Sequence, residues 1–322
     1  MKLTQLRYLQ AVIETGSFRA AARRLGVSQP TVSEQIKLLE EELDLVLVSR
    51  GGGSTKPTAE AATLMPIVGR LLDEERNLRE EAASVHGLNT GTVRLGSIST
   101  LSQTIVAEVL PTYRHVHPRI KFSVFEGGSR TITEQVRSGD LDLGLIAMAA
   151  DEPLGDEYVV SHLFDDRTVL CVPKSFNTPH GARLRLPDLA AEPWIVQGEE
   201  YSRHRMLTRL AGSTALNVVY QSNNPNSTLR LVAAGVGIAL VSEMSYLTCD
   251  LADRRQVRLI PIDAPAMVLC MVSRTHAAPS PAVRELRPLL RRAAVKVRSR
   301  LQELDAQVVS AEGGSGAQRR QG

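Results

Sequence analysis

The residues best suited to recognition chemistry lie between Ser28 and Lys37 and carry short polar side chains. At helical spacing, one face of this stretch presents Gln29, Thr31, Ser33, Glu34 and Lys37. The opposite face is apolar and consists of Val32, Ile36, Leu39 and Leu43. Ser28 is a good N-cap, and Pro30 is tolerated in the first turn because no intrahelical hydrogen bond is lost there. The stretch predicts a helix that presents amides, hydroxyls and charges to a partner.

The elements around this helix must hold it at a fixed angle. Ser17 is suited to cap a shorter helix that Gly26 closes. Thr4 is expected to cap a first helix that ends near Gly16. The apolar residues 45–48, the glycines at 51–53 and the Lys-Pro pair after them predict a small two-stranded wing. Residues 1–58 therefore predict a winged helix-turn-helix, which is a DNA-binding unit.

Residues 59–88 predict a long linker helix. Between Ala61 and Val85, apolar residues recur at alternating steps of three and four, interrupted by Glu75. This heptad spacing favours a two-stranded helical dimer over a helix packed only on its own domain. The residues expected at the dimer contact are Leu64, Val68, Leu71 and Leu78. Two-fold pairing would let two helix-turn-helix units read two half-sites.

The remaining chain, over residues 89–304, alternates short strands with helices. Strand patterns at 93–96, 120–125 and 141–146 are separated by helical segments, and a second set begins near Thr168. This alternation is typical of parallel βαβ units. A helix is expected from Ala282 to about Leu304, followed by a disordered tail at 305–322.

Composition argues against several classes of protein. The 322 residues are 43% hydrophobic, and a net charge of +3 is too small to indicate nucleic-acid binding by itself. Cys171, Cys249 and Cys270 form no CxxC pair, which argues against zinc sites and disulfides. The apolar runs are too short to cross a membrane, and the N-terminus does not resemble a signal peptide, so a cytoplasmic, nucleoid-associated location is expected. Hydrolase, metallopeptidase and dinucleotide-binding motifs are absent, so we expect no catalytic residues, metal or cofactor.

These patterns resemble the LysR-type transcriptional regulators over about residues 1–300. The matching residues are Leu6, Ser17-Phe18, Ala21-Ala22, Leu25, Ser28-Gln29-Pro30-Thr31-Val32-Ser33, Gln35-Ile36, Leu39-Glu40 and Leu43. Weaker matches are Leu110-Pro111, His117-Pro118, Gly139-Asp140-Leu141-Asp142 and residues 235–239. The chain departs from the family at Glu34, where arginine is frequent, at Val48, where phenylalanine is usual, and at Ser242, where proline is common.

The resemblance implies an α/β fold class with three parts. These are a winged helix-turn-helix at 1–58, a dimerisation helix at 59–88, and a two-lobed effector domain at 89–304 similar to type 2 periplasmic binding proteins. Lobe I is expected at about 89–162 and 268–304, and lobe II at about 163–267.

The resemblance also implies that the helix beginning at Ser28 enters the major groove. Gln29 is then the candidate for a bidentate contact with adenine, worth about 1–3 kcal/mol of discrimination. Pro30 and Thr31 are expected to meet thymine methyl groups, and Ser33 and Lys37 a phosphate or a base edge. Glu34 is expected to accept from cytosine or to hold a neighbouring basic residue. Arg50 and Lys56 are expected to bind phosphates from the wing.

A ligand cleft between the lobes is the further implication. Thr100, Ser129 and Asn223 match positions that line the effector pocket in the family. Ser99, Ser102 and Asn224 stand in the same loops, and Arg203 would add a positive charge. Hydroxyls and amides near helix N-termini hold carboxylates well, so a small anionic or polar effector is expected.

The expected partners are double-stranded DNA with an interrupted inverted repeat, a small-molecule effector and RNA polymerase. The chain is expected to form a homodimer or homotetramer and not to bind a membrane. An architectural DNA-binding protein, a solute-binding-type sensor without a diffusible effector, and an enzyme are the alternatives. Seven basic residues between Arg284 and Arg300 indicate a solvated helix face, with an auxiliary DNA contact or tetramer packing as alternatives.

Overall fold

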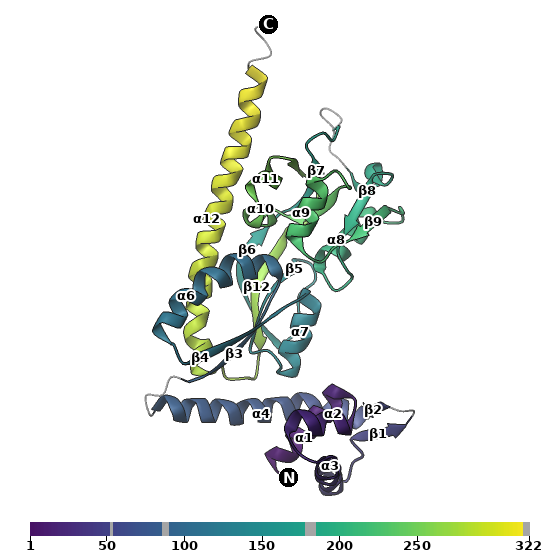
Figure 1. Cartoon of the computed structure of the whole chain (residues 1–322), viewed down its shortest axis with the longest axis vertical. Helices are drawn as coiled ribbons and strands as arrows, with labels where there is room; N and C mark the ends of the chain where they lie inside the picture. The colour runs from purple at the N-terminus through teal and green to yellow at the C-terminus, as the bar shows by residue number, and fades with distance from the viewer. Residues whose placement is uncertain (52–53, 86–89, 178–184, 318–322) are drawn as a thin grey trace.

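The computed structural model describes residues 1–51, 54–85, 90–177 and 185–317. Figure 1 shows three parts: a helical head, the long helix α4 (Ala59–Val85), and an α/β domain that lies above this helix. The head lies at the N-terminal half of α4. The predicted fold class and order of parts are confirmed.

The head is built from α1 (Leu3–Thr15), α2 (Phe18–Leu25) and α3 (Gln29–Leu43). The Ser17 and Ser28 side chains cap α2 and α3 by accepting from first-turn amides, and Gly26 ends α2 with a φ of +68°. The expected cap at Thr4 is wrong because α1 already begins at Leu3, where the Gln5 side chain accepts from the Lys2 amide. The head core includes Leu6, Val12, Ala21, Ile36 and Leu39.

The wing consists of β1 (Val48–Gly51) and β2 (Ser54–Pro57), paired antiparallel. A carboxylate oxygen of Glu40 accepts from the amides of Leu47 and Val48 at 2.8 and 3.1 Å. The Thr55 amide donates to the Gly16 carbonyl at 2.9 Å. Val48 is only 5% exposed and packs into the head core. These contacts fix the wing relative to α3 and the end of α1.

The helix α4 (Ala59–Val85) packs part of its heptad pattern against the head. Ala61 and Val68 are buried in the head core, and Leu64 is half-buried beside them. Leu71 and Leu78 are 40% and 71% exposed. The prediction of a dimer contact at Val68 is therefore wrong, because the chain's own head covers that side chain.

Lobe I is a mixed five-stranded sheet in the order β4-β3-β5-β12-β6. As the βαβ prediction requires, β3 (Gly91–Ser97) pairs in parallel with β4 (Ile120–Glu126) and β5 (Leu143–Ala149). β12 (Met267–Arg274) and β6 (Tyr158–Asp166) extend the sheet in antiparallel pairing. The helices of lobe I are α5 (Ser99–Leu101), a π-helical segment (Ser102–Val106), α6 (Ala107–Val116), α7 (Ser129–Ser138) and α12 (Pro281–Ala317).

Lobe II contains two smaller sheets. β7 (Thr168–Pro173) lies between β10 (Ala239–Ser242) and β11 (Val257–Pro261), antiparallel to both. β8 (Pro193–Val196) pairs in parallel with β9 (Asn217–Gln221). The helices are a short 3-10 turn (Leu186–Leu189), α8 (Ser202–Ala211), α9 (Pro225–Ala233), α10 (Ser245–Thr248) and α11 (Leu251–Arg254). The buried Trp194 links the sheets through a bridge to Ile238.

Two boundaries differ from the predictions. β6, which was not predicted, pairs with β12 as far as Asp166, so lobe I reaches residue 166 rather than 162. The predicted tail at 305–322 is wrong as far as Ala317, because α12 continues to that residue, and residues 318–322 lie outside the described residues. The sequence from Asp305 to Ala311 holds no glycine or proline that would stop a helix. Figure 1 shows the end of α12 extending past lobe II.

Candidate functional site

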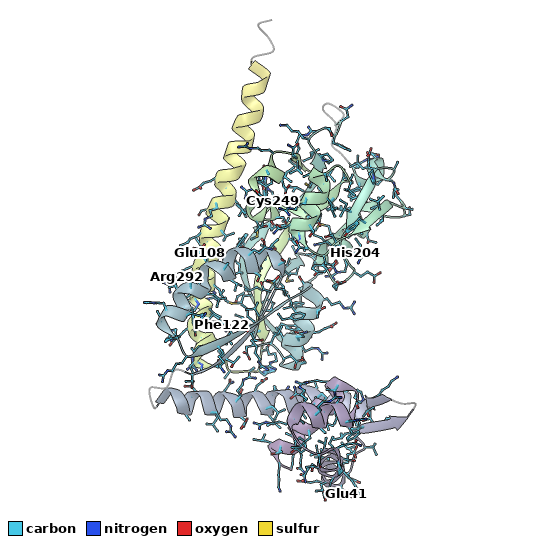
Figure 2. All side chains as sticks on the ribbon, in the orientation of Figure 1. Glu41, Glu108, Phe122, His204, Cys249 and Arg292 are labelled. Carbon is cyan, nitrogen blue, oxygen red and sulfur yellow. The ribbon has the colours of Figure 1, made fainter. Side chains whose placement is uncertain are left out.

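The outer face of α3 carries the residues predicted to read DNA. The exposed ones are Ser28, Gln29, Pro30, Thr31, Glu34 and Lys37, and Ser33 is half-buried. The Ser28 and Thr31 hydroxyl oxygens lie 2.7 Å apart, so both belong to the helix cap. Lys37 pairs with Glu41 at 3.4 Å, and Figure 2 shows Glu41 at the outer edge of the head. Gln29 stands at the N-terminal end of α3, the end that contacts bases in helix-turn-helix units.

The wing carries an exposed lysine. Lys56 is exposed and lies opposite Ser49 in the two-stranded ladder. Arg50 pairs with Thr55 in the same ladder, and its side chain lies outside the described residues. The exposure of Lys56 fits a contact with a phosphate.

Between the lobes lies a cleft of about 370 Å³, part of which is open to solvent. Lobe I lines it with Ile98, Ser99, Thr100, Ser129 and Ala147. Lobe II lines it with Gln197, Tyr201, Ser202, Arg203, Asn223 and Pro225. Five predicted residues therefore meet in one place: Ser99, Thr100, Ser129, Arg203 and Asn223.

Four helices begin at this cleft, and their first residues line it. Ser99 begins α5, Ser129 begins α7, Ser202 begins α8 and Pro225 begins α9. The amides of a first helical turn lack intrahelical acceptors and carry a partial positive charge. At α9, Pro225 has no amide hydrogen and the Asn224 side chain already accepts from the next two amides, so the available first-turn amides belong to α5, α7 and α8. The convergence favours a ligand with negative charge or hydrogen-bond acceptors.

Two predicted residues do not line the cleft. The Ser102 hydroxyl donates to the Glu126 carboxylate at 2.6 Å, at the start of the π-helical segment. The Asn224 side chain accepts from the Asn226 and Ser227 amides as the N-cap of α9. Ser102 and Asn224 are therefore corrected from effector contacts to a surface hydrogen bond and a helix cap.

Sequence reasoning missed Ser202, Tyr201 and Gln197. The Ser202 hydroxyl of lobe II donates to the Ala147 carbonyl of lobe I at 2.8 Å. The Ala147 amide donates to the Ser129 hydroxyl at 3.1 Å. The serine that begins the helix after Trp194–Glu200 was the signal that could have identified Ser202.

Arg203 is held by a buried carboxylate at the lobe crossing. Its guanidinium lies 2.5 Å from Asp166, and the Ser242 hydroxyl donates to both Asp166 oxygens at 2.8 and 2.7 Å. Burial raises the pKa of Asp166, and the charge of Arg203 offsets part of that shift. The Arg203 Nε atom is buried without a partner among the described residues. An acceptor in the cleft would satisfy that donor.

Asn223 is also fixed in place. Its side-chain oxygen accepts from the Gly198 amide at 2.8 Å, and its nitrogen donates to Glu200 at 3.1 Å. The amide therefore enters the cleft wall in one orientation.

The described residues give little support for a reactive thiol or a metal site. Cys171, Cys249 and Cys270 are free and buried. Burial raises the pKa of Cys171 and of Cys270 to about 12, which disfavours the reactive thiolate. Among the described residues, no group of three or more His, Cys, Asp or Glu could hold a metal ion. No helix in the described part of the chain is long and apolar enough to span a membrane.

Known proteins match both parts of the chain. Residues 3–62 match the bacterial regulatory helix-turn-helix model of the lysR family, and residues 86–295 match the LysR substrate binding domain. The probable regulator LrrA of Synechococcus elongatus is 29% identical over 248 residues, covering 76% of this chain and 82% of LrrA.

Solved structures share the fold. Full-length OxyR from Pseudomonas aeruginosa superposes with a TM-score of 0.67 at 21% identity, over 91% of this chain and 94% of OxyR. Full-length CbnR complexed with its target DNA superposes with a TM-score of 0.54 at 22% identity, over 91% of this chain and 100% of CbnR. The chain belongs to the LysR family, whose members are DNA-binding transcriptional regulators with an effector-binding domain.

Proposed function

We propose that this regulator reads an interrupted inverted repeat in double-stranded DNA and that a small anion in the cleft changes its action on transcription. The regulator acts on chromosomal DNA in the cytoplasm. It changes transcription by contacting RNA polymerase. The anionic class of the effector is supported by two observations: the N-termini of α5, α7 and α8 meet at one cleft, and the buried Arg203 Nε atom there has no partner among the described residues.

Base reading is assigned to the N-terminal part of α3. Gln29 is exposed there, and its amide matches the donor and acceptor of adenine. Pro30 and Thr31 are exposed beside it and supply apolar surface for thymine methyl groups. Glu34 is exposed on the same helix and can accept from a cytosine amine. Because arginine is frequent at this position in the family, Glu34 would give this regulator an operator of its own.

Phosphate contacts are assigned to Ser33, Lys37, Arg50 and Lys56. Lys37 and Lys56 are exposed, and the pair that Lys37 makes with Glu41 is solvent-accessible on both sides, so it is weak enough to yield to a phosphate. Such contacts position the protein on the duplex and contribute the salt dependence of binding.

Pairing of two chains is assigned to the outward face of α4. Leu71 and Leu78 are exposed seven residues apart, with Leu64 one heptad earlier and Ile67 43% exposed nearby. This apolar stripe on a long helix supports a two-stranded contact. Two such dimers would form the expected homotetramer.

The effector class can be tested by thermal unfolding in the presence of small carboxylates and their matched amides. A ligand that binds the folded state raises the melting temperature. We expect carboxylates, and not the amides, to stabilise the wild-type protein. Arg203→Gln should abolish the shift, whereas Arg205→Gln on the same helix, which removes a partly exposed pair with Glu152, should keep it. An unmoved melting temperature with every carboxylate, or an Arg203→Gln variant that responds like the wild type, would refute the anionic class.

A further inference from the structure

The strand β6 forms one edge of the lobe I sheet. It pairs with β12 on one side and has no strand on its other side among the described residues. The Thr275 amide donates to the Glu157 carbonyl at 3.0 Å, so the backbone groups of residues 157, 159 and 161 face β12. The N–H and C=O groups of the alternate residues Val160 and His162 therefore face away from the sheet.

Exposed apolar side chains lie along this edge. Val159 and Val160 are 41% and 40% exposed. Val159 lies opposite Ser273, whose hydroxyl accepts from α12, and so Val159 is on the face of the sheet that α12 covers. Val160 is on the other face, as is Tyr158, whose hydroxyl donates to a carbonyl of α7. A strand added to this edge would therefore meet an apolar side chain on each face.

The helix α12 carries a row of arginines beside the same edge, hereafter the arginine stripe. Arg284, Arg291 and Arg298 are spaced seven residues apart, and Arg287 lies between the first two on the same side of the helix. Arg291 donates to the Ser161 hydroxyl of β6 at 3.2 Å. This bond shows that the arginine stripe lies next to β6.

The arginine stripe is short of negative charge. Arg284 pairs with Glu81, but Arg287, Arg291 and Arg298 form no ion pair among the described residues. Burial and repulsion from Arg291 lower the pKa of Arg287. A carboxylate placed beside these two cations would offset the repulsion between them.

A second copy of the chain is a poor partner for this edge. Antiparallel pairing of β6 with β6 of another copy would bring two arginine stripes together, and like charges at close range oppose such pairing. Charged side chains beside an edge strand are a common protection against pairing of identical strands. The charge therefore favours a partner strand that carries carboxylates.

We propose that the edge of β6 and the arginine stripe of α12 bind an extended acidic segment of a partner protein, which adds a strand to the lobe I sheet. The backbone of that segment bonds to Val160 and His162, and its side chains alternate between the two faces of the sheet. Side chains on the α12 face meet Arg287 and Arg291 and are acidic, whereas those on the other face meet Val160 and are apolar. The partner segment is thus an alternation of acidic and apolar residues over about five or six positions.

Binding of labelled peptides to the full-length protein, measured by fluorescence anisotropy, tests the proposal. The probe is a peptide of about ten residues in which glutamate and valine alternate. Its control has the same composition with the glutamates in one block and the valines in another. We expect saturable binding of the alternating peptide and affinity at least about tenfold lower for the block peptide, which cannot present acidic side chains to one face only.

Two double variants test the contribution of the arginine stripe. Arg291→Gln with Arg298→Gln should weaken binding of the alternating peptide about tenfold, because two exposed ion pairs are lost. The matched control is Arg292→Gln with Lys296→Gln, which removes the same charge from another side of α12. Arg292 lies about 100° around the helix from Arg291, and Lys296 pairs with Glu108 of α6. The control should bind the peptide as the wild type does.

Two further measurements distinguish strand addition from a loose ionic contact. Saturating peptide should slow hydrogen exchange at the amides of Val160 and His162 and leave β9, an edge strand of lobe II, unchanged. Methylation of alternate peptide nitrogens should abolish binding when the methylated amides face β6. Methylation of the other set of amides, which face away from β6, should be tolerated.

Several outcomes would overturn the proposal. These are the absence of saturable binding by the alternating peptide, equal affinity for the block peptide, and an equal loss of affinity in the two double variants. Exchange of β6 that the peptide leaves unchanged, or equal affinity of the two methylated peptides, would contradict strand addition in the same way.

Discussion

The polar residues of the head and those of the cleft are held in opposite ways. On α3 and the wing, Gln29, Glu34 and Lys56 are exposed side chains on a rigid support. In the cleft, Ser202 and Arg203 are bonded to other parts of the chain and largely withdrawn from water. The outer face of the head presents its polar side chains to solvent, whereas the polar side chains of the cleft belong to a buried network of hydrogen bonds and ion pairs.

This difference predicts where binding and stability are separable. A substitution on the outer face of α3 removes a contact with DNA and leaves the fold intact, because exposed positions contribute little to stability. A substitution in the cleft wall breaks an internal hydrogen bond or ion pair at the same time.

The largest expected effect is on the cleft side. Asp166→Asn would leave the buried Arg203 charge unpaired and should lower the free energy of unfolding by about 3–5 kcal/mol. Denaturant unfolding followed by the fluorescence of Trp194, the single tryptophan of the chain, measures this. Asp188→Asn, which removes an exposed pair with Arg185, is the control and should leave the midpoint unchanged. Equal midpoints for the two variants would contradict the buried network.

On the head side, Gln29→Ala should leave the unfolding midpoint unchanged and reduce sequence discrimination by about 1–3 kcal/mol. The measurement compares affinities for the operator and for random DNA of the same length. If both affinities fell by the same factor, Gln29 would not be a base-reading residue.

A smaller effect is expected at the wing. Lys56→Ala should weaken binding to operator and random DNA alike and lower the slope of log affinity against log salt by about 0.9. Titrations at several salt concentrations measure the slope. A loss confined to the operator would assign Lys56 to base reading instead of phosphate binding.

The smallest effect concerns the joint between the head and α4. A hydrogen bond from Arg79 and the nearby Arg7 hold the pKa of Glu75 below its ordinary value of 4.5. Because the pKa is lower in the folded state, the pairing stabilises the protein above pH 4.5, and the gain is lost as the pH falls through the folded-state value. The difference in unfolding free energy between wild type and Glu75→Gln should therefore be present at neutral pH and disappear once acid has protonated Glu75 in the folded state as well. A difference that persists in acid would show that the charge is not its cause.

The head could be predicted almost residue by residue because its signals are local. The N-caps at Ser17 and Ser28 and the break at Gly26 depend on side chains within one helical turn, and all three are confirmed. The surroundings of the α4 heptad were harder to predict, because heptad spacing indicates which residues share a helix face but does not indicate which neighbour covers that face. Val68 is an example, since the chain's own head covers it.

The cleft was predicted only in part because its walls come from segments far apart in sequence. Ser129 and Arg203 were found, whereas the buried Asp166 that holds Arg203 lies on β6, which the sequence did not mark as a strand. Hydroxyls in the loops look alike in sequence. The Ser102 hydroxyl is bonded to the Glu126 carboxylate instead, a pairing across 24 residues that no local sequence pattern indicates.

Sequence-specific recognition of an inverted repeat can be tested by sequencing the genomic DNA fragments that the purified protein retains. We expect fragments that share an interrupted inverted repeat, with half-sites about 34–36 Å apart or a multiple of that distance, and a loss of enrichment with Gln29→Ala. Retained fragments without a common repeat, or enrichment that Gln29→Ala leaves unchanged, would contradict it.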